Sequence, residues 1–254
     1  GCPDLDRVIE VDGDGTEYDR MESVLERGAD EFDAVQADRG TDSIIVYTSG
    51  STGPPKGVLH THDSWAGFTI APYMFCERDI IGKAQFWTPA DWAWFGGLTI
   101  LTNAWHYGRP ILGYPMKGFD STTAFDLMEE FDITNVFLPP TALRMMIQNV
   151  EDPGERFDLS LATIACGGEP LTPEILDWAD TTFEDVVINE FYGQSEANML
   201  ISNCRDWFEA RAGSMGKACP GHEVAVIDNE TGEKLPPGDI GEIAVRHEGD
   251  PAIF

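Results

Sequence analysis

The 254-residue chain has few positive charges: 16 Lys and Arg residues stand against 45 Asp and Glu residues, and five of the basic residues are lysine. The formal net charge is −29. Because nucleic-acid-binding proteins neutralise phosphates with Lys and Arg, this balance disfavours nucleic acid as a partner. The acidic residues spread along the chain instead of forming a tail, which predicts a haloadapted, folded surface and a very salty native environment.

Long hydrophobic runs are also absent. No stretch of eighteen consecutive apolar residues occurs, and the N-terminus lacks the basic and apolar regions of a signal peptide. We therefore expect a cytoplasmic protein without a membrane span. Apolar residues still make up 42% of the chain, with 14 Phe, 7 Trp and 6 Tyr. That content suffices for a substantial core, in one large domain or two small ones.

Cysteine is sparse and scattered. The five cysteines form no C-x-x-C pair, so neither a metal site nor a redox site is indicated by their spacing. We expect them to be reduced, buried thiols. Their positions are Cys2, Cys76, Cys166, Cys204 and Cys219.

The order of apolar segments predicts three regions. Residues 1–42 form an acidic lead-in with one helix near 21–29, residues 43–212 an α/β core, and residues 213–254 a β-rich, barrel-like segment. In the core, strands alternate with amphipathic helices, which predicts a mostly parallel sheet with helices on both faces. The expected strands are 83–88, 109–113, 134–138, 161–166 and 186–190, and the expected helices are 62–75, 95–107, 121–131, 141–149 and 173–183.

The most informative segment runs from Tyr47 to Gly57 and follows an apolar stretch. Glycines let backbone N–H groups approach oxygen anions, hydroxyls donate further hydrogen bonds, and one lysine adds a positive charge. The segment is therefore predicted to hold the phosphates of a nucleotide. The residues that would do so are Thr48, Ser49, Gly50, Ser51, Thr52, Gly53 and Lys56.

The spacing differs from that of a Walker-type P-loop, G-x-x-x-x-G-K followed by Ser or Thr. Counting from Gly50, Pro55 occupies the place of the second glycine, and Gly57 follows Lys56. A cluster of Ser, Thr and Gly by itself also fits a plain linker. The continuation Pro-Pro-Lys-Gly between two hydrophobic segments favours a phosphate loop of another kind.

At these residues the sequence resembles the adenylate-forming superfamily of AMP-forming acyl-CoA synthetases, luciferases and peptide-synthetase adenylation domains. The family loop runs Tyr or Phe, Thr, Ser or Thr, Gly, Ser or Thr, Thr, Gly, any residue, Pro, Lys, Gly, Val. The range from Tyr47 to Val58 matches every fixed position. The resemblance extends over residues 41–254 and implies ATP, Mg²⁺ and coenzyme A as small-molecule partners.

Two later blocks support the resemblance. Ala165 to Leu171 contains a Gly-Gly turn after an expected strand, and the family implies that Gly168, Glu169 and Pro170 border the adenine. Taken without the family, this block would be an ordinary strand-to-helix turn. The second block ends the next strand, and the nucleotide-binding residues implied there are Glu190, Phe191, Tyr192, Gly193, Gln194 and Ser195.

The resemblance assigns roles within that second block. Tyr192 is expected to stack on adenine, Ser195 to bond the α-phosphate, and Glu196 to hold Mg²⁺ with Thr48 nearby. Ser195 stands where the family pattern has threonine. Both hydroxyls can donate, although the missing methyl leaves the contact less constrained. Lys56, Ser195 and Glu196 would promote the reaction by positioning and charge neutralisation.

Gly193 and an aromatic block at residues 86–94 predict which acyl substrates the pocket accepts. Acetate-specific synthetases carry tryptophan at the position of Gly193, so glycine predicts a pocket open to longer acyl chains. Trp92 and Trp94 resemble the acyl-side motif of medium-chain acyl-CoA synthetases, and an aromatic core segment is the alternative. His60 and His62 have the H-x-H form of a metal pair, but we expect no metal there.

The resemblance implies ATP-dependent conversion of a short- to medium-chain fatty acid to acyl-AMP, followed by transfer to coenzyme A. Alternatives are a non-catalytic nucleotide-binding module and an aryl or amino-acid adenylating enzyme. The family's ribose-binding aspartate, hinge and C-terminal lysine have no counterpart before Phe254. We therefore expect an excised fragment with weak nucleotide binding and negligible turnover. The oligomeric state is left open.

Overall fold

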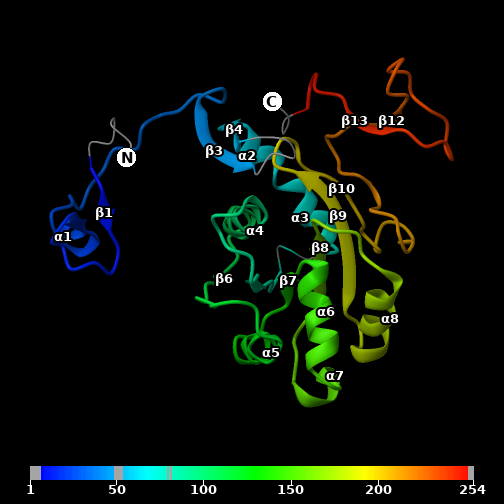
Figure 1. Cartoon of the computed structure of the whole chain (residues 1–254), viewed down its shortest axis with the longest axis horizontal. Coiled ribbons are helices and arrows are strands. Elements are labelled where there is room, and N and C mark those ends of the chain that lie inside the picture. Colours follow the sequence, from blue (N-terminus) through cyan, green and yellow to red (C-terminus); the bar gives the residue numbers. More distant parts are fainter. Residues whose placement is uncertain (1–6, 49–53, 79, 81, 251–254) are drawn as a thin grey trace. The chain divides into compact units, whose positions relative to one another are not determined.

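The computed structural model describes residues 7–48, 54–78, 80 and 82–250. Contacts divide the chain into two compact units, Gly1–Asp38 and Arg39–Phe254. In the first unit, the short strands β1 (Ile9–Glu10) and β2 (Asp19–Arg20) pair in parallel and precede helix α1 (Met21–Glu26). The second unit holds all the other helices and strands that the structure describes (Figure 1).

The second unit is built on a seven-stranded sheet with the order β11-β10-β9-β8-β7-β5-β6. The five strands from β9 to β6 are mutually parallel, and β10 and β11 continue the sheet antiparallel. The mostly parallel α/β fold predicted from the sequence is thereby confirmed. The strand bounds are β5 (Phe86–Trp87), β6 (Ile111–Leu112), β7 (Asn135–Phe137), β8 (Thr163–Gly167), β9 (Val187–Gln194), β10 (Asn198–Ser202) and β11 (Lys217–Ala218).

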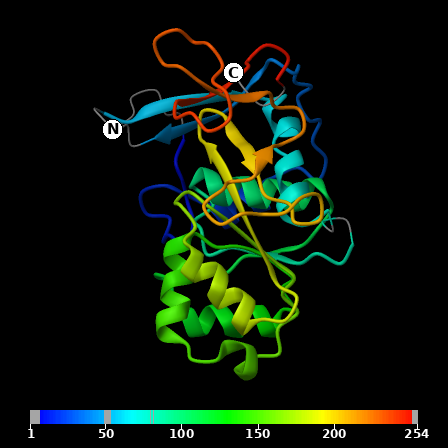
Figure 2. The ribbon, with the colours of Figure 1, turned by 90° about the vertical axis from the view of Figure 1, so that its right-hand side faces the viewer.

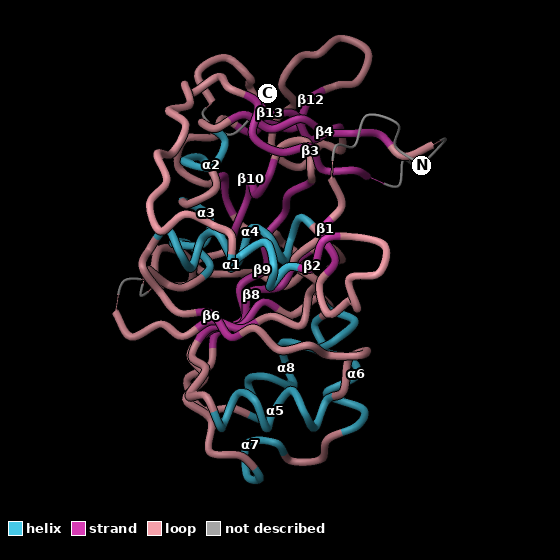
Figure 3. The backbone as a smooth tube through the Cα atoms, turned by 90° about the vertical axis from the view of Figure 1, so that its left-hand side faces the viewer, coloured by secondary structure: helices cyan, strands magenta, loops and turns pink. Residues whose placement is uncertain are grey.

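Helices cover both faces of this sheet because side chains alternate along each strand. Val136 and Ile164 belong to one apolar cluster, with α5 (Ser121–Glu130), α6 (Pro140–Asn149) and α8 (Pro173–Thr182). Phe137 and Ala165, the next residues, belong to another, with α3 (Ile70–Phe75) and α4 (Phe95–His106). Figure 2 shows the green helices α5 and α6 together on one side, and Figure 3 shows α3 and α4 on the other.

Several helices begin where local chemistry dictates. The carboxylate of Asp120 accepts a hydrogen bond from the Thr123 N–H at 2.8 Å, which caps α5. Proline occupies the first turn of α6, of α7 (Pro153–Arg156) and of α8, where its missing N–H has no helical partner to lose. The predicted helices 121–131, 141–149 and 173–183 begin and end within one residue of α5, α6 and α8.

Two antiparallel pairs complete the described part of the unit. Strands β3 (Asp42–Thr48) and β4 (Lys56–Thr61) flank the predicted phosphate loop. Strands β12 (Val224–Ile227) and β13 (Glu242–Val245) form the β-rich segment near the C-terminus. No described helix is long and apolar enough to cross a membrane.

The prediction of one helix over 62–75 is wrong. The structure divides this range into α2 (Ser64–Gly67) and α3, separated by Phe68 and Thr69. Pro72 has no N–H to donate to the carbonyl of Phe68, so a continuous helix would lack that bond. The hydroxyl of Thr69 instead donates to the Ala66 carbonyl at 2.8 Å. Strands β4 and β10 were not predicted.

Candidate active site

The carboxyl ends of β7, β8 and β9 border an apolar cavity of about 130 Å³. Ligands bind at this edge of parallel α/β sheets because loops from neighbouring strands converge there. Four of the twelve lining residues are aromatic, and six of the twelve were predicted from the sequence to bind ligands. The lining residues are Trp94, Phe95, Gly96, Thr99, Phe137, Gly168, Phe191, Gly193, Gln194, Ser195, Asn198 and Met199.

The Gly-Gly turn after β8 is close-packed against β9. A Cβ atom on Gly167 would lie 2.7 Å from the Phe191 ring, so only glycine lets the strand end pass that ring. Gly168 has φ +90°, a conformation that L side chains rarely adopt. Both glycines are therefore required by the path of the chain at the cavity edge.

Gly193 lies close to the backbone of β10. A Cβ atom there would lie 1.9 Å from the carbonyl oxygen of Asn198. Asn198 itself has φ 52° and is buried, so the turn between β9 and β10 is tight. A larger residue at 193 would need displacement of β10 as well as space in the cavity. The link between Gly193 and acyl chain length stays a prediction.

Ser195 and Glu196 lie in the turn that follows β9. Ser195 is half-buried and lines the cavity, whereas Glu196 is exposed. The imidazole of His60, on β4, is buried and lies close to the Ser195–Glu196 turn, because both the Ser195 backbone and the Glu196 charge influence its pKa. Strand β4 and this turn are therefore neighbours, although 135 positions separate His60 from Ser195.

Burial lowers the pKa of His60 below its usual value, while the Ser195 backbone and the Glu196 charge oppose that shift. The ring is stacked on Phe95 of α4. Within the residues that the structure describes, no group of three His, Cys, Asp or Glu residues could hold a metal ion. His60 thus belongs to an aromatic cluster, with no such metal group around it.

Thr48 and Lys56 close the hairpin on either side of the predicted phosphate loop. They are directly opposite each other in the β3–β4 register, so their side chains lie on the same face. His60 has the same parity as Lys56 in β4 and therefore points to that face too. Five predicted phosphate ligands lie outside the described residues: Ser49, Gly50, Ser51, Thr52 and Gly53.

Glu169 and Glu190, both predicted to bind the nucleotide, lie outside the cavity wall and differ from each other in burial. Hydrogen bonds from Thr141, together with Arg144, lower the pKa of the exposed Glu169. Glu190 is buried, and burial raises its pKa against the effect of the Leu171 N–H. Neither carboxylate is among the residues that line the cavity.

The remaining predicted residues are placed as follows. Trp92 lines a second, open groove of about 400 Å³ with Tyr114 and Met116, whereas Trp94 lines the first cavity. Tyr192 is half-buried on β9, opposite Ile201 of β10. Pro170 is exposed between β8 and α8. The aromatic block 86–94 therefore serves two separate cavities.

The four described cysteines are buried thiols that form no disulfide with one another, as the sequence predicted. Burial raises the pKa of Cys204 to about 11 and that of Cys219 to about 12, and it raises the pKa of Cys166 further. These thiols are protonated at neutral pH and therefore poor nucleophiles.

The profile of the AMP-binding enzyme family matches residues 3–249. The chain belongs to the AMP-binding enzyme family. The resemblance noted from the phosphate loop is thereby confirmed. The match includes both predicted nucleotide-binding blocks and the β3–β4 hairpin that flanks the loop.

Curated members of this family match over most of the chain. The acyl-coenzyme A synthetase ACSM3 of Rattus norvegicus is 32% identical over 231 residues, 90% of this chain and 39% of that protein. The acetyl-coenzyme A synthetase of Bacillus subtilis is 30% identical over 255 residues, which cover 96% of this chain and 43% of that protein. The chain thus spans about two fifths of the length of these relatives.

Solved structures of the family share the fold. An acyl-CoA synthetase from Brucella canis superposes with a TM-score of 0.81 at 30% identity, over 93% of this chain and 43% of that one. ATP-bound MatB from Rhodopseudomonas palustris superposes with a TM-score of 0.76 at 26% identity, over 92% of this chain and 44% of that one.

Sequence reasoning missed six residues in the cavity wall: Phe95, Gly96, Thr99, Phe137, Asn198 and Met199. Phe137 could have been found, because it lies near the carboxyl end of the predicted strand 134–138, the edge of a parallel sheet where ligands bind. Asn198 and Met199 could not, because β10 was not predicted. His60 was considered only as a metal ligand, and its proximity to Ser195 has no local sequence signal.

Proposed function

We propose that this chain provides the nucleotide- and acyl-binding part of an AMP-forming acid–thiol ligase. The carboxylate of a short- to medium-chain fatty acid attacks the α-phosphorus of ATP, giving acyl-AMP and pyrophosphate. The thiol of coenzyme A then attacks the acyl carbonyl and releases AMP. The proposal depends on one observation above all: the buried His60, just beyond the predicted phosphate loop, lies close to the Ser195–Glu196 turn.

That proximity supports a single binding site for the triphosphate. Thr48 and Lys56 share a face of the hairpin with His60, and His60 lies close to the Ser195–Glu196 turn. Lys56 would neutralise phosphate charge, and Ser195 would donate to the α-phosphate. The apolar cavity between Trp94 and Phe191 would take the acyl chain.

Mg²⁺ would be held by Glu196 with Thr48. Glu196 is an exposed carboxylate, the kind of hard oxygen ligand that Mg²⁺ prefers, and Thr48 offers a hydroxyl. Mg²⁺ usually takes one or two protein ligands, with phosphates and water completing its shell, so the small donor set fits. When bound, the ion neutralises phosphate charge.

We further propose that the protein works in a salt-rich cytoplasm. With 29 net negative charges at about 20 Å in unscreened water, each negative charge on ATP would meet about 6 kcal/mol of repulsion. At about 1 M salt the screening length falls to about 3 Å and that repulsion nearly vanishes.

Nucleotide binding tests the site in this chain. Lys56→Met is expected to weaken ATP binding by about tenfold to one hundredfold, because a charge-assisted contact contributes about 1.5–3 kcal/mol. Adenosine binding should change little. Lys83→Met is the matched control, since exposed Lys83 precedes β5 at the opposite edge of the parallel strands. Equal losses in both variants would contradict the assignment.

The reaction is tested on the polypeptide extended to the length of its curated relatives. An acid–thiol ligase should exchange labelled pyrophosphate into ATP only when a suitable carboxylic acid is present. A panel of alkyl, aryl and amino acids distinguishes the candidate substrates. ATP binding without acid-dependent exchange would instead indicate a non-catalytic nucleotide-binding module.

A further inference from the structure

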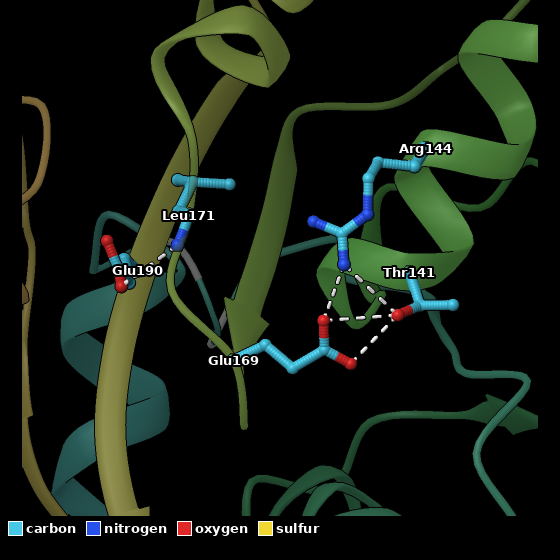
Figure 4. A network of polar contacts seen from close by, with 5 residues as sticks. All are labelled: Thr141, Arg144, Glu169, Leu171 and Glu190. Atoms are coloured by element: carbon cyan, nitrogen blue, oxygen red, sulfur yellow. Dashed lines mark hydrogen bonds and ion pairs between the residues drawn. The ribbon is translucent and has the colours of Figure 1, made fainter.

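The turn that follows β8 is anchored from one side by α6 (Figure 4). The Thr141 hydroxyl donates to Glu169 Oε1 at 2.8 Å, and Arg144 Nη2 donates to Glu169 Oε2 at 2.5 Å. Arg144 also donates to the Thr141 hydroxyl at 3.2 Å. Both partners project from the first turns of one helix, so the Glu169 side chain is held at a fixed place beside α6.

The same turn is anchored from the other side by β9. The Leu171 N–H donates to Glu190 Oε1 at 3.3 Å, and the Glu190 side chain is buried (Figure 4). Glu190 is itself fixed, because it is paired with Cys166 in the sheet and its carbonyl accepts the Asn203 N–H at 2.8 Å.

Between these anchors the backbone has little support of its own. The β8–β9 pairing ends at Gly167 and Phe191, and residues 168–171 belong to no helix or strand. Gly168 at φ +90° lines the cavity. Because ladder hydrogen bonds stop here, the turn is held by the side-chain contacts of Glu169 and Glu190 together with the buried side chain of Leu171.

We propose that Thr141, Arg144 and Glu190 are positioning residues that fix the Gly168–Pro170 turn against the base of a bound nucleotide. The inference rests on the proposed function and on the implication of the family resemblance that Gly168, Glu169 and Pro170 border the adenine. A turn held in place before binding spares the ligand the cost of ordering it. These residues act through the turn and need not touch the nucleotide.

The ion pair favours a role in positioning over one in stability. The side chains of Arg144 and Glu169 are 40% and 43% exposed, and exposed pairs contribute little to the free energy of unfolding. Losing the pair should therefore leave the fold intact and let the turn move. The measurable effect should appear in nucleotide affinity.

If Arg144 and Glu169 acted on the nucleotide only through their charges, the two variants would change AMP affinity differently from what positioning predicts. Arg144→Met removes a positive charge and Glu169→Gln removes a negative one, so a long-range effect would move AMP affinity in opposite directions. A positioning effect weakens binding in both variants. It also acts on adenosine, which carries no charge.

The test is calorimetric binding of adenosine, AMP and pyrophosphate to this chain. Each single variant, Arg144→Met and Glu169→Gln, should bind adenosine about threefold to tenfold more weakly, as for loss of one ordered contact. Because they break the same contact, the double variant should be no weaker than about twice the worse single. Pyrophosphate affinity should be retained.

The second anchor is tested by substitutions at Glu190. Glu190→Leu removes the acceptor of the Leu171 N–H and should weaken adenosine binding to a similar extent. Glu190→Gln keeps a side-chain oxygen and should recover most of that loss. If both substitutions weaken binding equally, the hydrogen bond to Leu171 does not position the turn.

Arg246→Met is the matched control. Arg246 forms an exposed ion pair with Glu223 at 3.0 Å, away from the turn in the β12–β13 segment. Opposite shifts in AMP affinity, additive losses, or unchanged adenosine binding in folded variants would overturn the inference alone. A wild-type chain that binds neither adenosine nor AMP would overturn the proposed function as well.

Discussion

The imidazole of His60 is stacked on the ring of Phe95, with ring centroids 4.8 Å apart and planes inclined by 29°. Phe68 packs edge-on to the same imidazole at 5.7 Å. Phe95 forms part of the cavity wall, and the Ser195–Glu196 turn lies close to His60. One buried side chain therefore connects the hairpin of the predicted phosphate loop to the wall of the cavity.

His60→Phe should separate the packing of the ring from its polar character. The substitution keeps an aromatic ring in the cluster, so the free energy of unfolding should fall by less than about 2 kcal/mol. ATP affinity should fall several-fold, because the Ser195–Glu196 turn loses the polar imidazole beside it. Denaturant unfolding and ATP titration measure the two effects.

His60→Ala should be more destabilising, by about 2–4 kcal/mol, because it leaves a cavity between two phenylalanine rings. His106, which is exposed at the end of α4, is the control. His106→Ala should stay within about 0.5 kcal/mol of wild type. Similar losses at both histidines would show that the His60 cluster does not support the hairpin.

Glu190 should make stability depend on pH. Burial raises its pKa in the folded state, so folding favours the protonated form. The benefit of protonation is present below the pKa of an unfolded glutamate and is lost as pH rises through the folded value. Glu190→Gln should therefore gain stability relative to wild type as pH rises from acid to neutral. The prediction is contradicted if urea unfolding shows the same difference in stability between Glu190→Gln and wild type at every pH.

Gly193→Ala should destabilise the β9–β10 pair. The new methyl would overlap the Asn198 carbonyl, and relieving such overpacking costs about 1–3 kcal/mol. Gly40→Ala is the control, since a Cβ atom at Gly40 meets nothing within 4 Å. Thermal unfolding of the two variants should differ clearly. Equal stability would mean that β10 shifts freely.

Salt should strengthen both folding and ATP binding. Screening removes repulsion among the acidic residues and between them and the nucleotide. Unfolding and ATP titrations between dilute and about 1 M KCl should show rising stability and affinity. Indifference to KCl over that range would reject the salt-rich environment.

The alternation of strands and helices was predictable because each buried strand is a short apolar run and each helix has an amphipathic pattern. The predicted strands 134–138 and 161–166 each end within one residue of the observed strand ends at Phe137 and Gly167. Strands β4 and β10 were missed for a physical reason. The signal of β4 merges with that of the following helices, and β10 pairs across a tight turn whose Asn198 has a positive φ.

The sequence by itself was enough to predict a phosphate loop, because hydroxyls, glycines and Lys56 are adjacent in the chain and their spacing is local. It also determined the parallel sheet. Only the tertiary structure decided that His60 lies close to the Ser195–Glu196 turn, that Trp92 and Trp94 line different cavities, and that the carboxylate of Glu190 accepts the Leu171 N–H. These relationships join segments far apart in the sequence, and only packing of the helices and strands brings such segments together.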